Sequence, residues 1–252
     1  MEFEAVRGIV DGVPNMTPEQ GRILYDLIRR TDAKWGMELG FAHGTGSCYM
    51  GAALEENGGK LVCIDNQTAR QREPNITEQL KKTKLTEVVR PVFAARSYTW
   101  ELMKLIEEHT EDGVCKPFVD ICYIDGAHQW EPDGMAFFLV DKLLKTGGWL
   151  LFDDIYWKYA ESTVRDEDWV RAMPEEERET AQVEQVFRLL VEQHPNYANC
   201  RVVDWWGWAQ KVSEETPPSS VLDEMGVRRT ALDHLKSILR PTVHAVRRKL
   251  GR

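Results

Sequence analysis

Short runs of apolar residues alternate with helix-like stretches along most of the chain. Apolar runs over residues 37–40, 61–64, 88–94, 118–124 and 149–152 predict five strands. Helix-like stretches lie before and between these runs, over residues 18–30, 47–56, 73–82, 98–109 and 135–144. Strands that alternate with helices in this way predict a parallel sheet with helices on both faces.

The pattern changes after residue 180. A helix is predicted over residues 182–192, and two strands over 200–204 and 206–212 are joined by a tight connection. Such a pair predicts an antiparallel hairpin at one edge of the sheet.

These patterns divide the chain into three regions. Residues 1–33 are predicted to form an N-terminal helical cap, 34–212 the α/β domain, and 213–252 a linker followed by a basic helical tail. Within the α/β domain, residues 154–180 are polar, acidic and rich in aromatic side chains. Long insertions of this kind are often functional, so we expect this one to form a lid over an active site.

The tail is strongly basic. It is predicted to contact an acidic partner, a sister subunit of a homo-oligomer or an anionic membrane, with a solvated tail as the alternative. Over residues 228–252, against one acid, Asp233, it carries eight basic residues: Arg228, Arg229, Lys236, Arg240, Arg247, Arg248, Lys249 and Arg252.

The composition excludes some classes of protein. The chain has 252 residues, which suffice for one large α/β domain and are few for two. A net charge of −9 argues against a general nucleic-acid-binding protein. The five cysteines form no C-x-x-C pair, and the N-terminus has no apolar signal segment. No apolar run approaches the ~20 residues of a membrane-spanning helix, so we expect a cytoplasmic protein with reduced thiols.

A glycine-rich turn follows the first predicted strand. Glu38 precedes Gly40 and Gly44, and Ser47 lies at the start of the next helix. The spacing differs from the Gly-x-Gly-x-x-Gly of dinucleotide-binding proteins, and a carboxylate here suits a ligand with a cationic amino group better than a pyrophosphate. Asp65, after the second strand, is placed to accept both hydroxyls of a ribose. A tight turn without a ligand is the alternative for the glycine segment.

With these features the chain resembles the class I S-adenosylmethionine-dependent methyltransferases over about residues 18–212. The resemblance implies an α/β, Rossmann-like fold: a seven-stranded, mostly parallel sheet with an antiparallel last strand and helices on both faces. It also implies that residues 34–212 bind S-adenosylmethionine. The contacts implied are to the methionine part (Glu38, Gly40, Gly44 and Ser47), the ribose (Asp65) and the adenine (Ser97 and Tyr98), with Asp125 beside them.

Three carboxylates follow the fourth and fifth predicted strands. Asp125 ends one strand, and Asp153 with Asp154 ends the next. Like charges in one cleft repel each other, and a hard cation such as Mg²⁺, or another divalent metal, would relieve the repulsion because it prefers oxygen ligands. The alternative is that these side chains cap the following helices.

The same residues resemble those of metal-dependent O-methyltransferases of the catechol and sugar-modifying type. That resemblance implies Asp125, Asp153 and Asp154 as metal ligands. The catechol-type enzymes hold a lysine base three residues after the first aspartate, and His128 occupies that position here. Histidine titrates near neutrality, so His128 can accept the proton of a substrate hydroxyl. Asp125 is predicted to be its catalytic partner.

Aromatic residues near these acids suggest a wall for a small-molecule acceptor such as a sugar, a polyketide or a phenol. Trp130, Tyr156 and Trp157 are the candidates, with core packing as the alternative. The predicted function is therefore methyl transfer from S-adenosylmethionine to a hydroxyl with metal assistance. Three alternatives stay open: a metal-independent methyltransferase, a non-catalytic S-adenosylmethionine-binding protein, and a nicotinamide-dependent oxidoreductase, whose glycine spacing the chain lacks.

Overall fold

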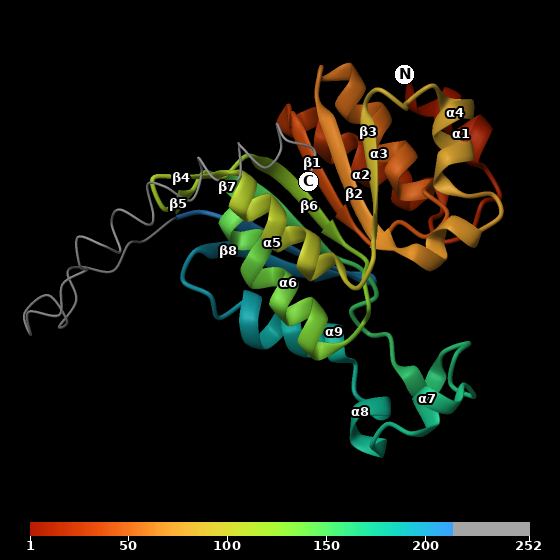
Figure 1. The fold of residues 1–252 in the computed structure, drawn as a ribbon, viewed down its shortest axis with the longest axis vertical. Helices are drawn as coiled ribbons and strands as arrows, with labels where there is room; N and C mark the ends of the chain where they lie inside the picture. The colour runs from red at the N-terminus through yellow and green to blue at the C-terminus, as the bar shows by residue number, and fades with distance from the viewer. Residues whose placement is uncertain (214–252) are drawn as a thin grey trace, which may run out of the picture.

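The computed structural model describes residues 1–213, and these form a sheet wrapped by helices (Figure 1). The predicted basic tail and most of its linker, residues 214–252, lie outside the described residues. None of the helices within residues 1–213 combines the length and the apolar character needed to cross a lipid bilayer.

The main sheet has seven strands in the order β3-β2-β1-β6-β7-β9-β8. The first five in this order run parallel, whereas β9 runs antiparallel to both of its neighbours, β7 and β8. The predicted seven-stranded sheet and its antiparallel last strand are therefore confirmed. The strands are β1 (Trp35–Leu39), β2 (Lys60–Asn66), β3 (Val89–Ala94), β6 (Val119–Ile124), β7 (Leu144–Phe152), β8 (Tyr197–Val203) and β9 (Trp206–Lys211).

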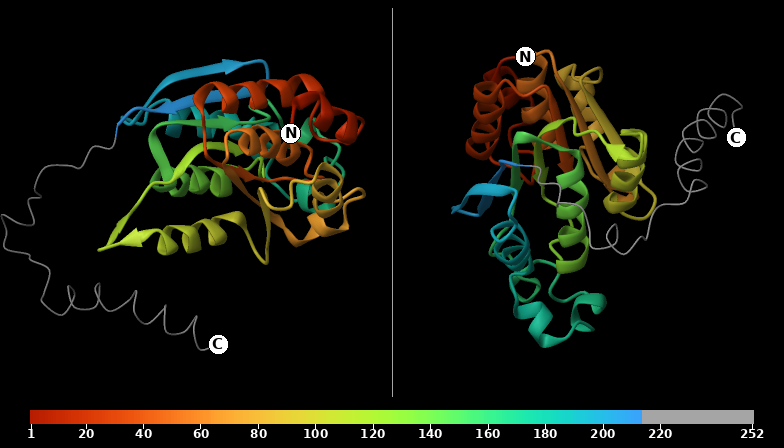
Figure 2. Two further views of the ribbon diagram at one scale, coloured as in Figure 1. Left: turned by 90° about the horizontal axis from the view of Figure 1, so that it is seen from above. Right: turned by 90° about the vertical axis from the view of Figure 1, so that its left-hand side faces the viewer.

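Helices cover both faces of this sheet, as the two views in Figure 2 show. One face packs against α1 (Phe3–Val10), α2 (Pro18–Thr31), α3 (Thr45–Glu56) and α4 (Ile76–Thr83). The other packs against α5 (Tyr98–Glu108), α6 (Trp130–Leu143) and α9 (Gln182–Val186). Each face of the sheet thus has its own apolar core. The central strands are buried on both sides, as is typical of parallel sheets.

Local sequence accounts for how the first helices begin. The Thr17 side chain accepts a hydrogen bond from the Gln20 backbone N–H, and the Gln20 side chain accepts one from the Thr17 N–H. This capping box, with Pro18 in the first turn, fixes the start of α2. Helix α3 begins at Thr45, two residues before the predicted start, because Gly44 adopts a left-handed backbone conformation that ends the turn there.

Several elements differ from the sequence expectation. Helix α6 begins at Trp130 and not at residue 135, because its first turn, which includes Pro132 and Asp133, is too polar to show an apolar period. The helix predicted over residues 182–192 is present, but it changes from α9 to a π-helical turn, η3 (Phe187–Val191). A small hairpin, β4 (Thr110–Glu111) with β5 (Val114–Cys115), and a 3₁₀ helix, η1 (Gln67–Gln71), were not predicted.

The insertion projects from the body of the molecule (Figure 1). It contains a short 3₁₀ helix, η2 (Tyr159–Glu161), followed by α7 (Asp168–Arg171) and α8 (Glu175–Glu179). It leaves the sheet at the carboxyl end of β7 and returns at α9, so its base lies beside the end of the sheet where the parallel strands terminate.

Two helical glycines give opposite predictions for stability. A Cβ at Gly21 of α2 would overlap the ring of Tyr49 in α3, whereas a Cβ at Gly8 of α1 would meet nothing within 4 Å. We expect Gly21→Ala to lower the free energy of unfolding by about 1–3 kcal/mol through overpacking. Gly8→Ala should raise it by about 0.5–1 kcal/mol through reduced chain entropy. Urea unfolding of both variants checks this, and equal stability of the two would contradict the described α2–α3 packing.

Candidate active site

The carboxyl ends of four parallel strands meet in register. Leu39 of β1 pairs with Ile64 of β2 on one side and with Ile124 of β6 on the other, and Ile124 pairs with Phe152 of β7. The strand order reverses between β1 and β6, which is where open α/β sheets bind ligands. The acidic and glycine-rich segments predicted as a site all follow these paired residues, so they lie along one edge.

The glycine turn after β1 packs directly on the end of β6. Gly40 and Gly44 both have φ +86°, in the left-handed region. A Cβ at Gly40 would overlap the carbonyl oxygen of Asp125, and a Cβ at Gly44 would overlap Ile76 of α4. Both positions therefore require glycine, and the turn joins the two halves of the sheet at the site.

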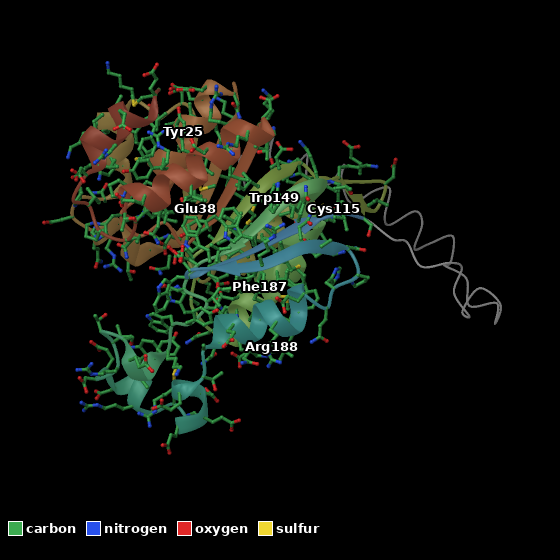
Figure 3. The ribbon with its side chains drawn as sticks, turned by 180° about the vertical axis from the view of Figure 1, so that it is seen from behind. Tyr25, Glu38, Cys115, Trp149, Phe187 and Arg188 are labelled. Atoms are coloured by element: carbon green, nitrogen blue, oxygen red, sulfur yellow. The ribbon has the colours of Figure 1, made fainter. Side chains whose placement is uncertain are left out.

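Glu38 lies beneath this turn with only 2% of its surface exposed, between the N-terminal helices and the strands (Figure 3). Its carboxylate accepts a hydrogen bond from the Ser47 hydroxyl. Among residues 1–213 no cationic side chain forms an ion pair with it. Burial, together with the negative charges of Asp125 and Asp65, raises the pKa of Glu38 to about 8, although the Ser47 hydrogen bond opposes the shift.

Asp65 binds the backbone of the same turn. One of its carboxylate oxygens accepts the N–H groups of Phe41 at 3.0 Å and Ala42 at 2.8 Å. The other oxygen accepts the Asn66 N–H at 2.6 Å. The carboxylate still has lone pairs available beyond these three bonds. Asp65 thus fixes the glycine turn from the second strand.

The two residues implied at the adenine follow β3. The Ser97 side chain is the N-cap of α5 and accepts a hydrogen bond from the Trp100 N–H at 3.3 Å. Tyr98 is largely buried, and its hydroxyl donates to Asp133 of α6. In the described structure both side chains therefore have structural partners of their own.

Asp125, His128 and Asp154 converge on one point. The Nε2 atom of His128 lies 3.3 Å from a carboxylate oxygen of Asp125 and 3.6 Å from one of Asp154. One potential ligand atom from each residue lies within 4.8 Å of the other two, and the three side chains are half-buried. The two carboxylate oxygens at this spacing suit a divalent cation, and the imidazole nitrogen lies beside them.

Two of these residues have strained backbones. His128 has φ +56° and Asp154 has φ +52°, both in the left-handed region. Each such residue costs on the order of 1–3 kcal/mol and persists only when its surroundings fix it. The bonds that hold these two backbones therefore help to set the directions of the His128 and Asp154 side chains.

The charge state of His128 follows from its neighbours. Burial by itself lowers the pKa of the imidazole, but the hydrogen bond and charge of Asp125, with the charges of Asp154 and Asp133, outweigh it and raise the pKa to about 9. In the cation-free protein His128 therefore carries a proton at neutral pH and compensates the carboxylates around it.

Asp153 lies differently from the other two predicted metal ligands. One of its oxygens accepts the hydroxyl of Tyr123, and the other accepts the Asp154 N–H at 2.7 Å. Burial raises the pKa of this carboxyl, and the charge of Asp125 raises it further. Asp153 thus holds the Asp154 backbone, and its own side-chain partner is Tyr123. No sequence pattern distinguishes Tyr123 from an ordinary core residue.

Aromatic rings continue from His128 toward the insertion. The Trp157 ring lies 4.9 Å from the His128 ring and 4.5 Å from the Tyr159 ring, centroid to centroid. Tyr156, which is 45% exposed, packs edge-on against Trp205, which is 53% exposed. Trp205 lies in the β8–β9 turn, and its carbonyl accepts the Ile155 N–H at 3.0 Å. It was not predicted as a site residue, because only the tertiary fold brings that turn beside β7.

The third predicted substrate residue begins α6. The Trp130 backbone N–H donates to the Gln182 side chain at 2.8 Å, and its ring is 38% exposed. Among the described residues, its ring does not take part in the His128–Trp157–Tyr159 ring contacts.

A cavity of about 380 Å³ lies at the opposite end of the sheet. Its lining includes Trp35, Arg90, His109 and Phe118, near the amino-terminal ends of β1, β3 and β6. Neither the glycine turn nor Glu38, Asp65, Asp125, Asp153 or Asp154 lines it, so it is not part of the candidate active site.

Residues 37–155 match the family described as a methyltransferase domain. Among curated proteins, none matches this chain. The O-methyltransferase TomG from Streptomyces achromogenes, solved with SAM and involved in tomaymycin synthesis, superposes with a TM-score of 0.58 at 20% identity, over 84% of this chain and 92% of that one.

Two further solved structures are similar. An O-methyltransferase from Bacillus cereus, in complex with SAH, has a TM-score of 0.59 at 16% identity and covers 84% of this chain and 92% of its own. A methyltransferase from Podospora anserina, bound to SAH, has a TM-score of 0.57 at 15% identity over 83% and 87%. At these identities the likeness establishes the fold, and the matched family identifies the domain. Residues 37–155 therefore form a methyltransferase domain, carried on the fold of the class I S-adenosylmethionine-dependent methyltransferases.

Proposed function

We propose that this protein is an O-methyltransferase that transfers the methyl group of S-adenosylmethionine to a hydroxyl of a small molecule, assisted by a divalent metal. One observation carries the proposal: the ligand atoms of Asp125, His128 and Asp154 converge within 4.8 Å at the same sheet edge as the buried Glu38. The solved neighbours described as O-methyltransferases support the same reaction class.

The residues present fit S-adenosylmethionine. Glu38 is a buried carboxylate without a cationic partner among the described residues, which suits the ammonium of the methionine part. Gly40 and Gly44 keep the turn above it free of side chains. Asp65 lies at the next strand end, where it is placed to accept ribose hydroxyls with its remaining lone pairs.

The residues also fit a hard divalent cation. Asp125 and Asp154 would hold it, because each presents a carboxylate oxygen toward the same point. Asp153 would support this site from behind through its hydrogen bond to the Asp154 N–H. Bound there, the cation supplies Lewis acidity that makes a nearby hydroxyl more acidic.

His128 is placed to accept the proton of the acceptor hydroxyl. Its Nε2 atom faces Asp125 and Asp154, the two carboxylates that keep it protonated in the cation-free protein. A bound cation would compensate the charge of these carboxylates and so remove a cause of the raised His128 pKa. The imidazole could then be neutral and act as a base. S-adenosylmethionine held by Glu38 and Asp65 would supply an electrophilic methyl group with a neutral thioether as leaving group, and the deprotonated hydroxyl oxygen would attack that methyl group in line. Alignment of the two reactants by this edge supplies much of the rate.

The acceptor is proposed to be a sugar, a polyketide or a phenol-like natural product. Trp157 beside His128, and the exposed Tyr156, offer flat apolar surfaces next to a polar centre. Trp130 stays a candidate at the start of α6. The involvement of TomG in tomaymycin synthesis supports a role in natural-product formation. The buried thiols of Cys48, Cys63 and Cys122 support our proposal that the protein works in the cytoplasm.

A metal-independent methyltransferase is the second candidate. The hydrogen bond of 3.3 Å between His128 and Asp125 favours it, because a histidine oriented by a carboxylate can act as a base without a cation. The two candidates differ in their response to a chelator.

We expect EDTA to abolish methyl transfer and Mg²⁺ or Mn²⁺ to restore it, measured as radiolabelled methyl transfer from S-adenosylmethionine to a panel of hydroxylated acceptors. Asp154→Asn should lower kcat by at least about 100-fold because it removes one ligand charge. Asparagine tolerates the left-handed backbone at this position, so the fold should survive. Binding of SAH should stay within about threefold of the wild type.

Asp112→Asn, in the exposed turn of the β4–β5 hairpin and also with a left-handed backbone, is the matched control and should leave turnover unchanged. Full activity in EDTA, together with an active Asp154→Asn variant, would rule out the metal and favour the metal-independent reaction. Turnover on no acceptor despite tight SAH binding would instead favour a non-catalytic binding protein.

Glu38 makes the stability of the cofactor-free protein depend on pH. Its pKa is about 8 when folded against 4.5 for the ordinary carboxyl, so between these values the folded state keeps a proton that the unfolded state loses. The stability that the protonated Glu38 contributes is therefore complete below pH 4.5 and is lost as the pH rises toward about 8. Glu38→Gln keeps the acceptor for Ser47 but cannot ionise. We expect its Tm to exceed that of the wild type near pH 9 by on the order of 5 °C, and the difference to shrink toward pH 5.

Scanning calorimetry across this range, with SAH titration at each pH, separates two outcomes. Parallel Tm curves for the two proteins would contradict the burial of an ionisable Glu38. If Glu38→Gln changes the stability but lowers the SAH affinity by less than about tenfold, Glu38 does not bind the ammonium group.

A further inference from the structure

Asp133 is a buried carboxylate that the reaction itself does not use. It lies in the first part of α6 with 1% of its surface exposed. Carboxylates are almost never buried to this extent unless their oxygens are hydrogen-bonded. Its partners therefore show what it holds in place.

The partners of Asp133 belong to the loop that carries His128. One carboxylate oxygen accepts the Gln129 N–H at 3.0 Å. The other accepts the hydroxyl of Tyr98 from α5 and lies 3.4 Å from the Ala127 N–H. Asp133 thus binds the backbone on both sides of His128, and α5 holds Asp133 itself.

The same loop is held from other directions. The Tyr159 hydroxyl, from the base of the insertion, donates to the Ala127 carbonyl at 2.8 Å. A Cβ at Gly126 would press on the Asp133 carboxylate and on the Tyr98 ring. Residues 126–129 are therefore fixed by side chains that lie outside the acidic cluster, which is what a left-handed His128 backbone requires.

We propose that Asp133 is a positioning residue: by binding the loop backbone at residues 127 and 129 it holds the His128 imidazole toward Asp125 and Asp154. The inference rests on the proposed function of that cluster. A carboxylate near a helix N-terminus also stabilises the helix as such, so the test must distinguish positioning from a purely structural role.

The test compares Asp133→Asn with Asp141→Asn in the full chain. Asp141 lies about two turns further along the same helix, and its carboxylate pairs with the buried Lys211 at 3.4 Å. In Asp133→Asn an amide donor faces N–H and O–H donors, so the loop should loosen. We expect the His128 ring signals in ¹⁵N-histidine NMR to shift, and the Kd for Mn²⁺ alone, measured by EPR, to rise by about tenfold. SAH affinity should stay within about threefold. Asp141→Asn should change neither the ring signals nor the Mn²⁺ affinity.

Unchanged His128 signals in a folded Asp133→Asn protein would overturn the inference, and so would equal effects of the two variants. If the wild type binds no Mn²⁺, the metal role fails while the ring signals still test Asp133.

Two measurements keep the inference testable if Asp133→Asn does not fold. Tyr159→Phe removes the bond to Ala127 and should shift the same ring signals by less. In the wild type, the Gln129 amide should exchange with solvent slowly despite its place in a loop. Exchange at the rate of an unstructured amide would contradict the bond to Asp133.

Discussion

The contact between the glycine turn and the end of β6 is the constraint on which the rest of the site depends. The Gly40 backbone lies against the Asp125 carbonyl, and the Asp125 N–H donates to the Leu39 carbonyl at 2.8 Å. This contact spans the point where the strand order reverses. It therefore sets the distance between the half of the sheet that carries Glu38 and Asp65 and the half that carries Asp125. Methyl transfer requires donor and acceptor to be collinear and close, so a side chain at position 40 would disturb both at once.

Bringing these strand ends together concentrates negative charge in a partly buried place. Burial and mutual repulsion raise the pKa values of Glu38 and Asp153, and His128 takes up a proton as partial compensation. Such an arrangement is unfavourable for the ligand-free fold and favourable for cationic ligands, because a sulfonium cofactor and a divalent cation would each supply the missing positive charge. Binding and stability are therefore linked through the same side chains.

The strands and the residues at their ends could be predicted because four of the five apolar runs, over residues 37–40, 61–64, 118–124 and 149–152, stop at a glycine or an acid, and parallel strands align such ends. Contacts made only in three dimensions could not. Asp133 follows Pro132 in a polar segment without an apolar period, so neither its burial nor the true start of α6 was visible. Trp205 reaches the site through the β8–β9 turn, far from it in sequence. The left-handed backbones of His128 and Asp154 likewise depend on tertiary bonds, since neither residue type requires them.

The four carboxylates around His128 and Asp154 divide into two kinds by their partners. Asp133 and Asp153 are both buried, and each accepts a tyrosine hydroxyl, Asp133 from Tyr98 and Asp153 from Tyr123. Asp133 also accepts the N–H of Gln129, next to the strained His128, and Asp153 accepts the N–H of the strained Asp154. Asp125 and Asp154 accept no such tyrosine bond and face His128 in a half-buried space. The buried pair thus fixes the backbone at His128 and Asp154, and the facing pair keeps its oxygens available. Strain at a site can persist only where neighbouring bonds outweigh it, and here each of the two strained residues has its own buried carboxylate to do so.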